Sequence, residues 1–238
     1  MTANGQPALP GVARSGISAV LYRLLRQVAH MVNRTYWRVA AEGAESVPVD
    51  GPVILAPVHR SFIDFFLVSE VTRRPIAFMA KDNLWRSRLG GKVLEWLGAF
   101  PVNRSGPDRG ALARAEAVLQ SGGVLVVFPE GTRRSGPVVE DLHEGAVFLA
   151  ARTGAPIVPI GIGGSEDAMP KGSKLLKPAR IALVVGEPIR PPEVGDAKRV
   201  SRHQLRQGGE QLRAELQRLF DIAGRRAADY ASSAPRAR

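Results

Sequence analysis

The most informative absence in this 238-residue sequence is cysteine, which does not occur at all. A chain without cysteine has no disulfide bond, no thiolate nucleophile and no cysteine ligands for zinc or an iron–sulfur cluster. Only four histidines are present, and no two of them have the spacing of a metal-binding motif, so we expect no metal and no cofactor. Any catalysis therefore depends on histidine, carboxylate, hydroxyl or cationic side chains.

Long hydrophobic runs are also missing. No stretch reaches the roughly 18–20 apolar residues that a helix needs to cross a bilayer, and the first residues lack the apolar centre of a signal peptide. Hydrophobic residues still make up 45% of the chain, which is enough for a buried core. We expect a protein on the cytoplasmic side of the cell membrane, with any membrane contact peripheral.

Negative charge is scarce. There are 22 acidic residues against 33 lysines and arginines, which gives a net charge of +11. Such an excess favours a nucleic acid, an anionic membrane surface or a phosphorylated substrate. Aromatic residues are only 6% of the chain and no zinc finger or RNP-type strand occurs, so we predict no nucleic-acid partner. Nothing in the sequence indicates an oligomeric state.

Short apolar runs alternate with helical patterns along the chain, which predicts an α/β fold with a largely parallel central sheet flanked by helices. The predicted strands are residues 52–57, 76–79, 99–102, 123–128, 157–162 and 180–185. The predicted helices are 62–72, 83–97, 107–121, 142–153 and 199–224. The predicted units are a flexible lead at 1–15, a helical segment at 16–44, the main domain at 45–225 and a disordered tail at 226–238.

The segment 17–40 has the pattern of an amphipathic, basic helix or helix pair. Apolar residues recur at helical spacing from Ile17 to Val32, and arginines such as Arg23 and Arg34 fall largely on the other face. Ordinary packing against the protein is one interpretation of the apolar face. Docking on an anionic membrane, with arginines on lipid phosphates, is the other.

Polar side chains follow three predicted strands directly: His59, Arg104 and Glu130. Because parallel strands place their carboxyl ends at one edge of a sheet, ligand-binding and catalytic residues usually lie at that edge.

Asp64 lies five residues after His59 and three after Ser61. Ser61 and Asp64 fit a helix capping box, and Asp64 in the first turn can face back and orient His59 as a general base. The two interpretations are compatible.

The segment 126–136, VVFPEGTRRSG, concentrates functional side chains at another strand end. Gly131 allows backbone amides to approach an anion closely, and Arg133 can hold a phosphate with two parallel hydrogen bonds. Lys81 supplies a flexible point charge. Taken singly, Arg104 and Lys81 are ordinary surface charges.

The order of these segments resembles a known family. His59-x4-Asp64, GAFPVNR at 98–104, FPEGTRRSG at 128–136 and APIVPIGI at 155–162 are similar to the four ordered blocks of the glycerolipid acyltransferases, 1-acylglycerol-3-phosphate acyltransferase (PlsC) type. The resemblance extends over roughly residues 45–190. It implies an α/β fold with an N-terminal element that docks on the membrane, and it makes 45–225 an acyltransferase domain.

The resemblance also implies roles for individual residues. His59 corresponds to the catalytic histidine and Asp64 to the aspartate that orients it. Substrate-binding positions are Lys81, Arg104, Glu130, Gly131, Thr132 and Arg133, while Pro159 lies on the acyl-donor side. The implied reaction moves a fatty acyl group from acyl-CoA, or from acyl carrier protein as partner, to the free hydroxyl of lysophosphatidic acid in phospholipid synthesis.

Two departures keep alternatives open. Val58 precedes the histidine where the family often has asparagine, and His143 and Glu144 stand where a basic side chain is expected. The same chemistry on glycerol-3-phosphate or another lysolipid is therefore one alternative. A different class of protein, which binds membranes or nucleic acid and keeps a vestigial site, is the other.

Overall fold

The central strands are buried on both faces, which is why the chain forms an internal parallel sheet. All five residues of β2 (Val53–Pro57) are buried, as are all seven of β6 (Ile157–Gly163). Strands of this kind read as continuous apolar runs because helices cover both sides of the sheet. These elements belong to a computed structural model, which describes residues 17–103, 108–173, 175–191 and 200–232.

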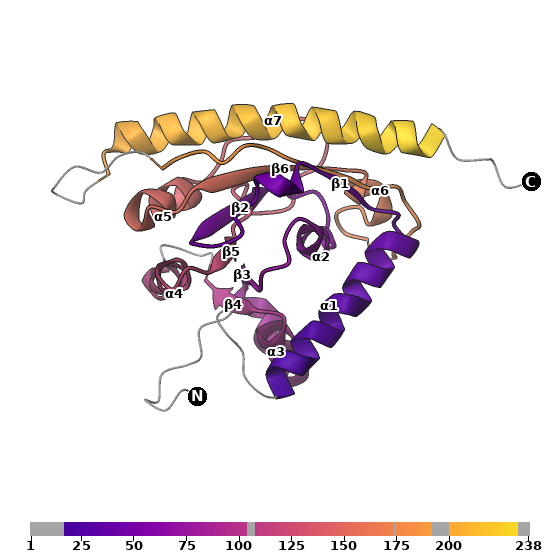
Figure 1. The fold of residues 1–238 in the computed structure, drawn as a ribbon, viewed down its shortest axis with the longest axis horizontal. Coiled ribbons are helices and arrows are strands. Elements are labelled where there is room, and N and C mark those ends of the chain that lie inside the picture. The colour runs from indigo at the N-terminus through magenta and orange to yellow at the C-terminus, as the bar shows by residue number, and fades with distance from the viewer. Residues whose placement is uncertain (1–16, 104–107, 174, 192–199, 233–238) are drawn as a thin grey trace, which may run out of the picture.

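Seven strands form one sheet in the order β1-β7-β6-β2-β5-β3-β4 (Figure 1). The other strands are β1 (Ala40–Glu42), β3 (Ile76–Lys81), β4 (Ala99–Val102), β5 (Val124–Val126) and β7 (Ala182–Val185). β6, β2, β5, β3 and β4 run parallel, whereas β7 is antiparallel to β6 and pairs in parallel with β1. The predicted α/β class with a largely parallel sheet is confirmed.

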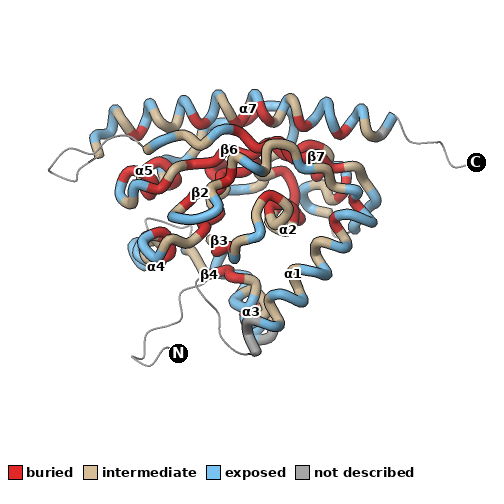
Figure 2. Tube along the Cα trace, in the orientation of Figure 1, coloured by how far each residue is buried: buried red, intermediate tan, exposed pale blue. Residues whose placement is uncertain are grey.

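Helices surround this sheet. They are α1 (Ile17–Thr35), α2 (Asp64–Leu67), α3 (Arg88–Trp96), α4 (Arg109–Gln120), α5 (Gly145–Thr153), α6 (Ser165–Ala168) and α7 (Arg202–Ser232). Short 3-10 turns are η1 (Ala44–Ser46), η2 (Val68–Glu70) and η3 (Asp82–Arg86). α4 and α5 pack together on one side, α1 and α2 lie on the other, and α7 crosses β6 and β7 (Figure 1). Buried positions concentrate along the strands and the inner faces of the helices (Figure 2).

Two predicted boundaries were wrong. The N-terminal helix ends at Thr35 rather than residue 40. Ala40–Glu42 forms a strand that pairs with β7, and the sequence pattern did not predict this strand. α7 continues to Ser232, seven residues into the predicted disordered tail, where Ala227 is still buried against the protein. The predicted lead 1–15 and residues 233–238 lie outside the described residues.

α1 is a single helix that uses only part of its apolar face for packing. Leu21 and Leu25 are half-buried toward the protein. Exposed apolar side chains repeat every three to four residues along the opposite edge and form what we term the α1 stripe: Val20, Leu24, Val28 and Met31, which are 64%, 59%, 46% and 59% exposed. The apolar face of the helix is therefore wider than the surface that the protein offers it.

Polar contacts fix α1 in this orientation. Arg26 donates to the backbone carbonyls of Ser69, Thr72, Arg73 and Arg74. Glu70 accepts a hydrogen bond from Asn33 at 2.8 Å and faces His30 Nδ1 at 2.6 Å. Part of the basic face thus binds the segment after α2, while Arg23 and Arg34 remain exposed. No helix in the described part of the chain combines the length and the apolar content needed to cross a bilayer.

Glycines in β6 allow α7 to approach the sheet at backbone distance. A Cβ atom on Gly161 would lie 2.3 Å from the carbonyl carbon and oxygen of Leu219, and one on Gly163 would lie 2.2 Å from the carbonyl oxygen of Ala223. No rotamer change relieves such contacts, because the obstacle is backbone. The glycines therefore set the distance between α7 and the sheet.

We predict that Gly161→Ala destabilises the protein by about 1–3 kcal/mol, since α7 has to move away from β6. Gly209 is the matched control, because it lies in α7 with nothing within 4 Å of its virtual Cβ. Gly209→Ala should stabilise by about 0.5–1 kcal/mol through higher helix propensity. Urea unfolding followed by circular dichroism measures both, and equal effects of the two substitutions would contradict the packing argument.

Candidate active site

His59 lies just beyond the carboxyl end of β2, a central strand with parallel neighbours on both sides. The imidazole stacks on Phe128, which follows β5, with 4.1 Å between ring centroids and 30° between planes. The side chain is 14% exposed, so one edge reaches solvent while the rest is held by neighbours. The fold thus presents one nitrogen of a fixed ring at the edge where ligands bind in such sheets.

Asp64 orients this ring. Its fully buried carboxylate accepts from three donors on one oxygen: His59 Nδ1 at 3.0 Å, Arg60 N at 2.7 Å and Ser61 N at 2.7 Å. Because a carboxylate only accepts, His59 carries its proton on Nδ1, and Nε2 is the nitrogen that can take a proton from a substrate. The predicted placement, with His59 ahead of the helix and Asp64 at its start facing back, is confirmed.

The capping box is only half present. Asp64 accepts the backbone N–H of Ser61 as a capping box requires, but α2 begins at Asp64 with Ile63 in the N-cap position. The hydroxyl of Ser61 instead donates to the carbonyl of Met169 at 2.8 Å. Ser61 therefore ties the turn of residues 59–64 to the segment after α6.

A buried ion pair holds the backbone of His59. Arg60 and Glu130 are 1% and 0% exposed, and Nη1 of Arg60 lies 2.6 and 2.8 Å from the two carboxylate oxygens. Glu130 also accepts the backbone N–H of His59 at 2.7 Å, while Nη1 donates to the carbonyl of His59 at 3.3 Å. The pair thus contacts His59 on both sides of its Cα atom.

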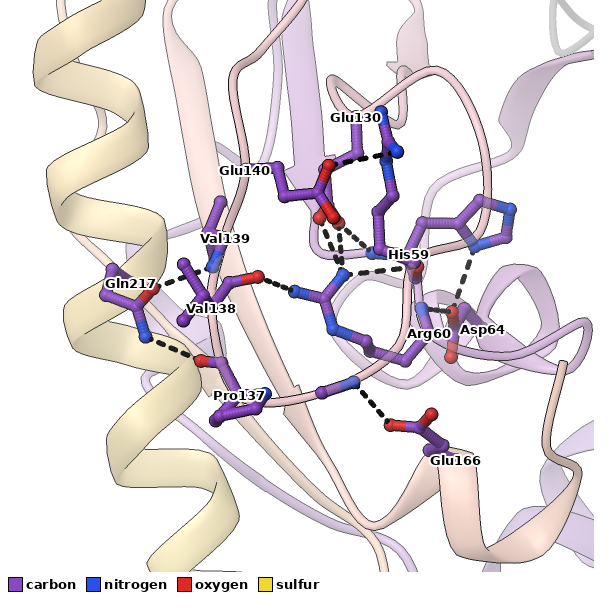
Figure 3. Close-up of polar contacts among 12 residues, drawn as sticks. His59, Arg60, Asp64, Glu130, Pro137, Val138, Val139, Glu140, Glu166 and Gln217 are labelled. Atoms are coloured by element: carbon purple, nitrogen blue, oxygen red, sulfur yellow. Dashed lines mark hydrogen bonds and ion pairs between the residues drawn. The ribbon is translucent and has the colours of Figure 1, made fainter.

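α7 extends this network from the other end (Figure 3). Nη2 of Arg60 donates to the carbonyl of Val138 at 3.0 Å. The side-chain amide of Gln217 accepts from Val139 N at 2.7 Å and donates to the carbonyl of Pro137 at 2.9 Å. Segment 137–139 is therefore held between Arg60 and α7.

A cleft of about 360 Å³ opens beside His59, within the size range of small-ligand pockets. One part of its wall is apolar, formed by Phe62, Phe65, Phe78, Leu84, Leu94, Leu97 and Phe128. The polar part includes Lys81, Asn83, Thr132 and Arg133. A site with one apolar wall and two cations beside a histidine suits a substrate with a hydrocarbon chain and an anionic group.

The apolar wall continues toward α1. A smaller cavity of about 30 Å³ shares Phe65, Phe78 and Leu97 with the cleft and is closed by Tyr22 and Leu25 of α1. The apolar surface that starts at His59 therefore extends to the helix that carries the α1 stripe.

Five of the predicted residues meet at this cleft. His59, Lys81, Thr132 and Arg133 line the cleft, with Asp64 behind His59. Glu130 differs from the expectation that it binds substrate, because its carboxylate is buried and occupied by Arg60 and His59 N. Pro159 is buried inside β6 and does not line the cleft. Arg104 lies outside the described residues.

Gly131 is required by the conformation of the turn, and its N–H group is not directed at an anion site. It adopts a left-handed conformation with φ of +66°, and its N–H donates to the carbonyl of Phe128 at 3.0 Å. A Cβ atom there would lie 2.3 Å from His143, which packs against this turn. The amides of Arg60 and Ser61, which follow His59, are bound to Asp64. Within the described residues, no group of three or more histidine or acidic side chains converges as metal ligands would.

Sequence reasoning missed Arg60 and Gln217. In the sequence, Arg60 looks like one of many surface arginines. In the structure it is buried because it forms an ion pair with the buried carboxylate of Glu130. Gln217 lies in a helix whose polar positions mostly face solvent. Its role depends on a contact with residues about eighty positions away, which no local pattern encodes.

Comparison with known proteins agrees with this arrangement. Residues 38–163 match the Acyltransferase family. The chain is 31% identical over 146 residues to the 1-acyl-sn-glycerol-3-phosphate acyltransferase of Bacillus subtilis, which covers 61% of this chain and 70% of that protein. It is 28% identical over 158 residues to chloroplastic LPAT1 of Arabidopsis thaliana, covering 65% of this chain and 44% of that one. It thus spans less than half of the plant relative.

A crystal structure shows the same fold. The 1-acyl-sn-glycerophosphate acyltransferase PlsC of Thermotoga maritima superposes with a TM-score of 0.68 at 24% identity, over 92% of this chain and 83% of that one. The family match spans the segments that place His59, Asp64 and Glu130 around one turn. The chain therefore belongs to the glycerolipid acyltransferase family of the PlsC type.

Proposed function

We propose that this protein transfers a fatty acyl group from an acyl thioester, acyl-CoA or acyl carrier protein, to the free hydroxyl of lysophosphatidic acid. The observation that carries the proposal is the fixed His59–Asp64 pair at a cleft with an apolar wall and two cations. The names of the relatives in Bacillus subtilis and Arabidopsis thaliana support the choice of acceptor.

In the proposed mechanism His59 is the general base. Nε2 accepts the proton of the acceptor hydroxyl as its oxygen attacks the thioester carbonyl, and the thiolate then leaves with that proton. Asp64 keeps Nδ1 protonated and stabilises the imidazolium that forms. Phe128 holds the ring plane from one face. Direct transfer needs no enzyme nucleophile, in keeping with a sequence that has no cysteine.

The cations of the cleft fit the anionic groups of the substrates. Arg133 can hold the phosphate of the acceptor with a fork of two N–H groups, and Lys81 adds a mobile charge at the end of β3. The hydroxyl of Thr132 is a further donor to phosphate or to the oxyanion. Because the amides of Gly131, Arg60 and Ser61 are already bonded, we assign the anionic groups to these side chains.

The membrane supplies the acceptor in this proposal. The α1 stripe is unpartnered, and Arg23 and Arg34 on the same helix remain exposed for lipid phosphates. An amphipathic helix of this kind lies in the interface with its apolar edge among the acyl chains. The protein then acts as a peripheral enzyme on the cytoplasmic side of the cell membrane, and the apolar wall from His59 to α1 guides the acyl chain.

The test of the function is an acceptor panel. Purified protein is given acyl-CoA, or acyl carrier protein loaded with the same chain, and lysophosphatidic acid, glycerol-3-phosphate or other lysolipids, with products identified by mass spectrometry. Release of free CoA with diacylated phosphatidic acid as the main product supports the proposal. Absence of acyl transfer to every acceptor contradicts it, and a preference for another acceptor moves the assignment to that lipid.

We predict that His59→Ala lowers kcat by about 10²–10⁴-fold, the usual contribution of a general base. Asp64→Asn should be nearly as severe, because the amide no longer fixes the Nδ1–H tautomer. Both variants should retain lipid binding, which vesicle co-sedimentation checks alongside steady-state kinetics. Full turnover in either one would overturn the assignment of the pair.

For the membrane, we predict that Leu24→Ser with Val28→Ser weakens co-sedimentation with anionic vesicles about tenfold or more, since each side chain contributes roughly 1.5–3 kcal/mol when buried. High salt should weaken binding further. Leu21 and Leu25 face the protein, so substitutions there would disturb packing instead. Val138→Ser, on an exposed residue beside α7, is the control. If the Leu24→Ser, Val28→Ser variant binds vesicles as well as the Val138→Ser control, the α1 stripe does not contact the membrane.

A further inference from the structure

The loop between α6 and β7 exposes two adjacent leucines. Leu175 is 72% and Leu176 is 51% exposed, although neither the proposed reaction nor the family match at 38–163 involves them. The hydroxyl of Ser173 accepts from the backbone N–H of Leu175 at 3.0 Å and donates to its carbonyl at 3.2 Å. The hydroxyl of Ser173 therefore holds both backbone polar groups of Leu175.

Two side chains that follow α1 hold the backbone of this loop at Leu176 and Lys177. Tyr36 donates its hydroxyl to the carbonyl of Leu176 at 3.2 Å, and the indole of Trp37 donates to the carbonyl of Lys177 at 3.1 Å. The loop thus lies beside the C-terminal end of α1, on the same flank of the molecule (Figure 1). Met31 and Tyr36 are exposed there too, so the apolar surface passes from the α1 stripe toward the leucines.

The charge around the leucines is basic. Lys171 and Lys177 are exposed on the same loop, and residues 169–180 contain no acidic residue. Arg34 and Arg38 are exposed on the adjoining end of α1. Apolar side chains framed by cations match a bilayer with anionic headgroups, where each nearby basic residue adds to the attraction.

We propose that Leu175 and Leu176 insert into an anionic bilayer as a second membrane contact beside the α1 stripe. This inference rests on the proposed membrane function. A single interfacial helix leaves the protein free to roll about the helix axis. A second contact off that axis fixes the orientation, and with it the direction in which the cleft faces the lipid.

The absence of cysteine allows a direct test. L175C labelled with an environment-sensitive fluorophore is titrated with vesicles of phosphatidylcholine containing about one third phosphatidylglycerol, and with vesicles of phosphatidylcholine alone. We expect a blue shift with the anionic vesicles, and quenching by spin labels on the acyl chains. V138C, labelled in the same way at an exposed position beside α7, should show neither.

A second measurement uses Leu175→Ser with Leu176→Ser. We expect about tenfold weaker binding to the anionic vesicles with an unchanged melting temperature, because the leucines are exposed in the free protein. Unchanged binding, or a labelled L175C that stays in water on bound vesicles, overturns the second contact. A wild-type chain that binds no vesicles also overturns it, while acyl transfer to a short-chain soluble acceptor still reports separately on the proposed reaction.

A separate observation concerns Gln217, which lies on α7 well beyond the family match at 38–163. Its side-chain amide makes hydrogen bonds to the backbone of Pro137 and Val139, as a neighbouring strand would. The same amide also donates a hydrogen bond to the carboxylate of Asp221 at 2.8 Å. One turn along the helix, the ring of Phe220 lies 4.7 Å from the guanidinium carbon of Arg60. α7 thus contacts both the segment after Arg133 and the cation of the buried ion pair.

We infer that Gln217 is a positioning residue for phosphate recognition. Residues 131–139 run as one loop from the turn at Gly131, through Thr132 and Arg133 at the cleft, to the segment that Gln217 binds. With the amide removed, the far end of this loop loses two hydrogen bonds, and we expect the loop that carries Arg133 to be less restrained. His59 keeps its own bonds to Asp64 and Glu130.

The test compares Gln217→Ala with Gln211→Ala, an exposed glutamine on the same helix. For Gln217→Ala we expect KM for lysophosphatidic acid to rise about tenfold, the equivalent of roughly 1.4 kcal/mol. KM for acyl-CoA, and activity on monoacylglycerol, which has no phosphate, should change little. Gln211→Ala should match wild type. An equal loss of activity on lysophosphatidic acid and monoacylglycerol, or no loss on either, overturns the inference. A wild-type protein that is inactive on both acceptors refutes the proposed function itself.

Discussion

One carboxylate oxygen organises the turn that carries His59. Oδ2 of Asp64 accepts from His59 Nδ1 and from the amides of Arg60 and Ser61, so residues 59–64 close into a compact loop before α2 begins. The bond from Nδ1 sets the tautomer of the imidazole, and the bonds from the two amides hold the turn that directs the ring. Since the carboxylate is wholly buried, water does not compete for these bonds, and the geometry is present before a substrate arrives.

A second buried carboxylate, that of Glu130, links this turn to other parts of the fold. Glu130 binds the amide of His59 and is neutralised by Arg60, which is itself bound to segment 137–139. A buried pair of this kind adds little stability compared with an apolar core, but loss of one partner leaves an unpaired charge and typically costs about 3–5 kcal/mol. The arrangement therefore favours one geometry of the turn over its alternatives, and it connects β2, the loop after β5 and α7 to a single histidine.

The sequence was most informative where the pattern was local. The buried strands and the order His59-x4-Asp64 predicted the sheet and the contact between His59 and Asp64, because strand burial and a five-residue turn depend on neighbours in the chain. The role of Glu130 was not readable in this way, since a strand-end glutamate looks the same whether it meets a ligand or an arginine. The orientation of α1 was hidden for a similar reason: Leu21 and Leu24 are equally apolar, and only the tertiary fold decides which one packs and which one is exposed.

The proposed mechanism requires that His59 holds its proton on Nδ1 and offers Nε2 to the substrate. Nitrogen-15 NMR of ring-labelled histidine tests it at about pH 8, above the usual imidazole pKa of roughly 6.5. With only four histidines, a His59→Asn variant assigns the signal. We predict a protonated Nδ1 and an unprotonated Nε2 in wild type, lost in favour of a tautomer mixture in Asp64→Asn. A wild-type signal with the proton on Nε2 would contradict the proposed mechanism.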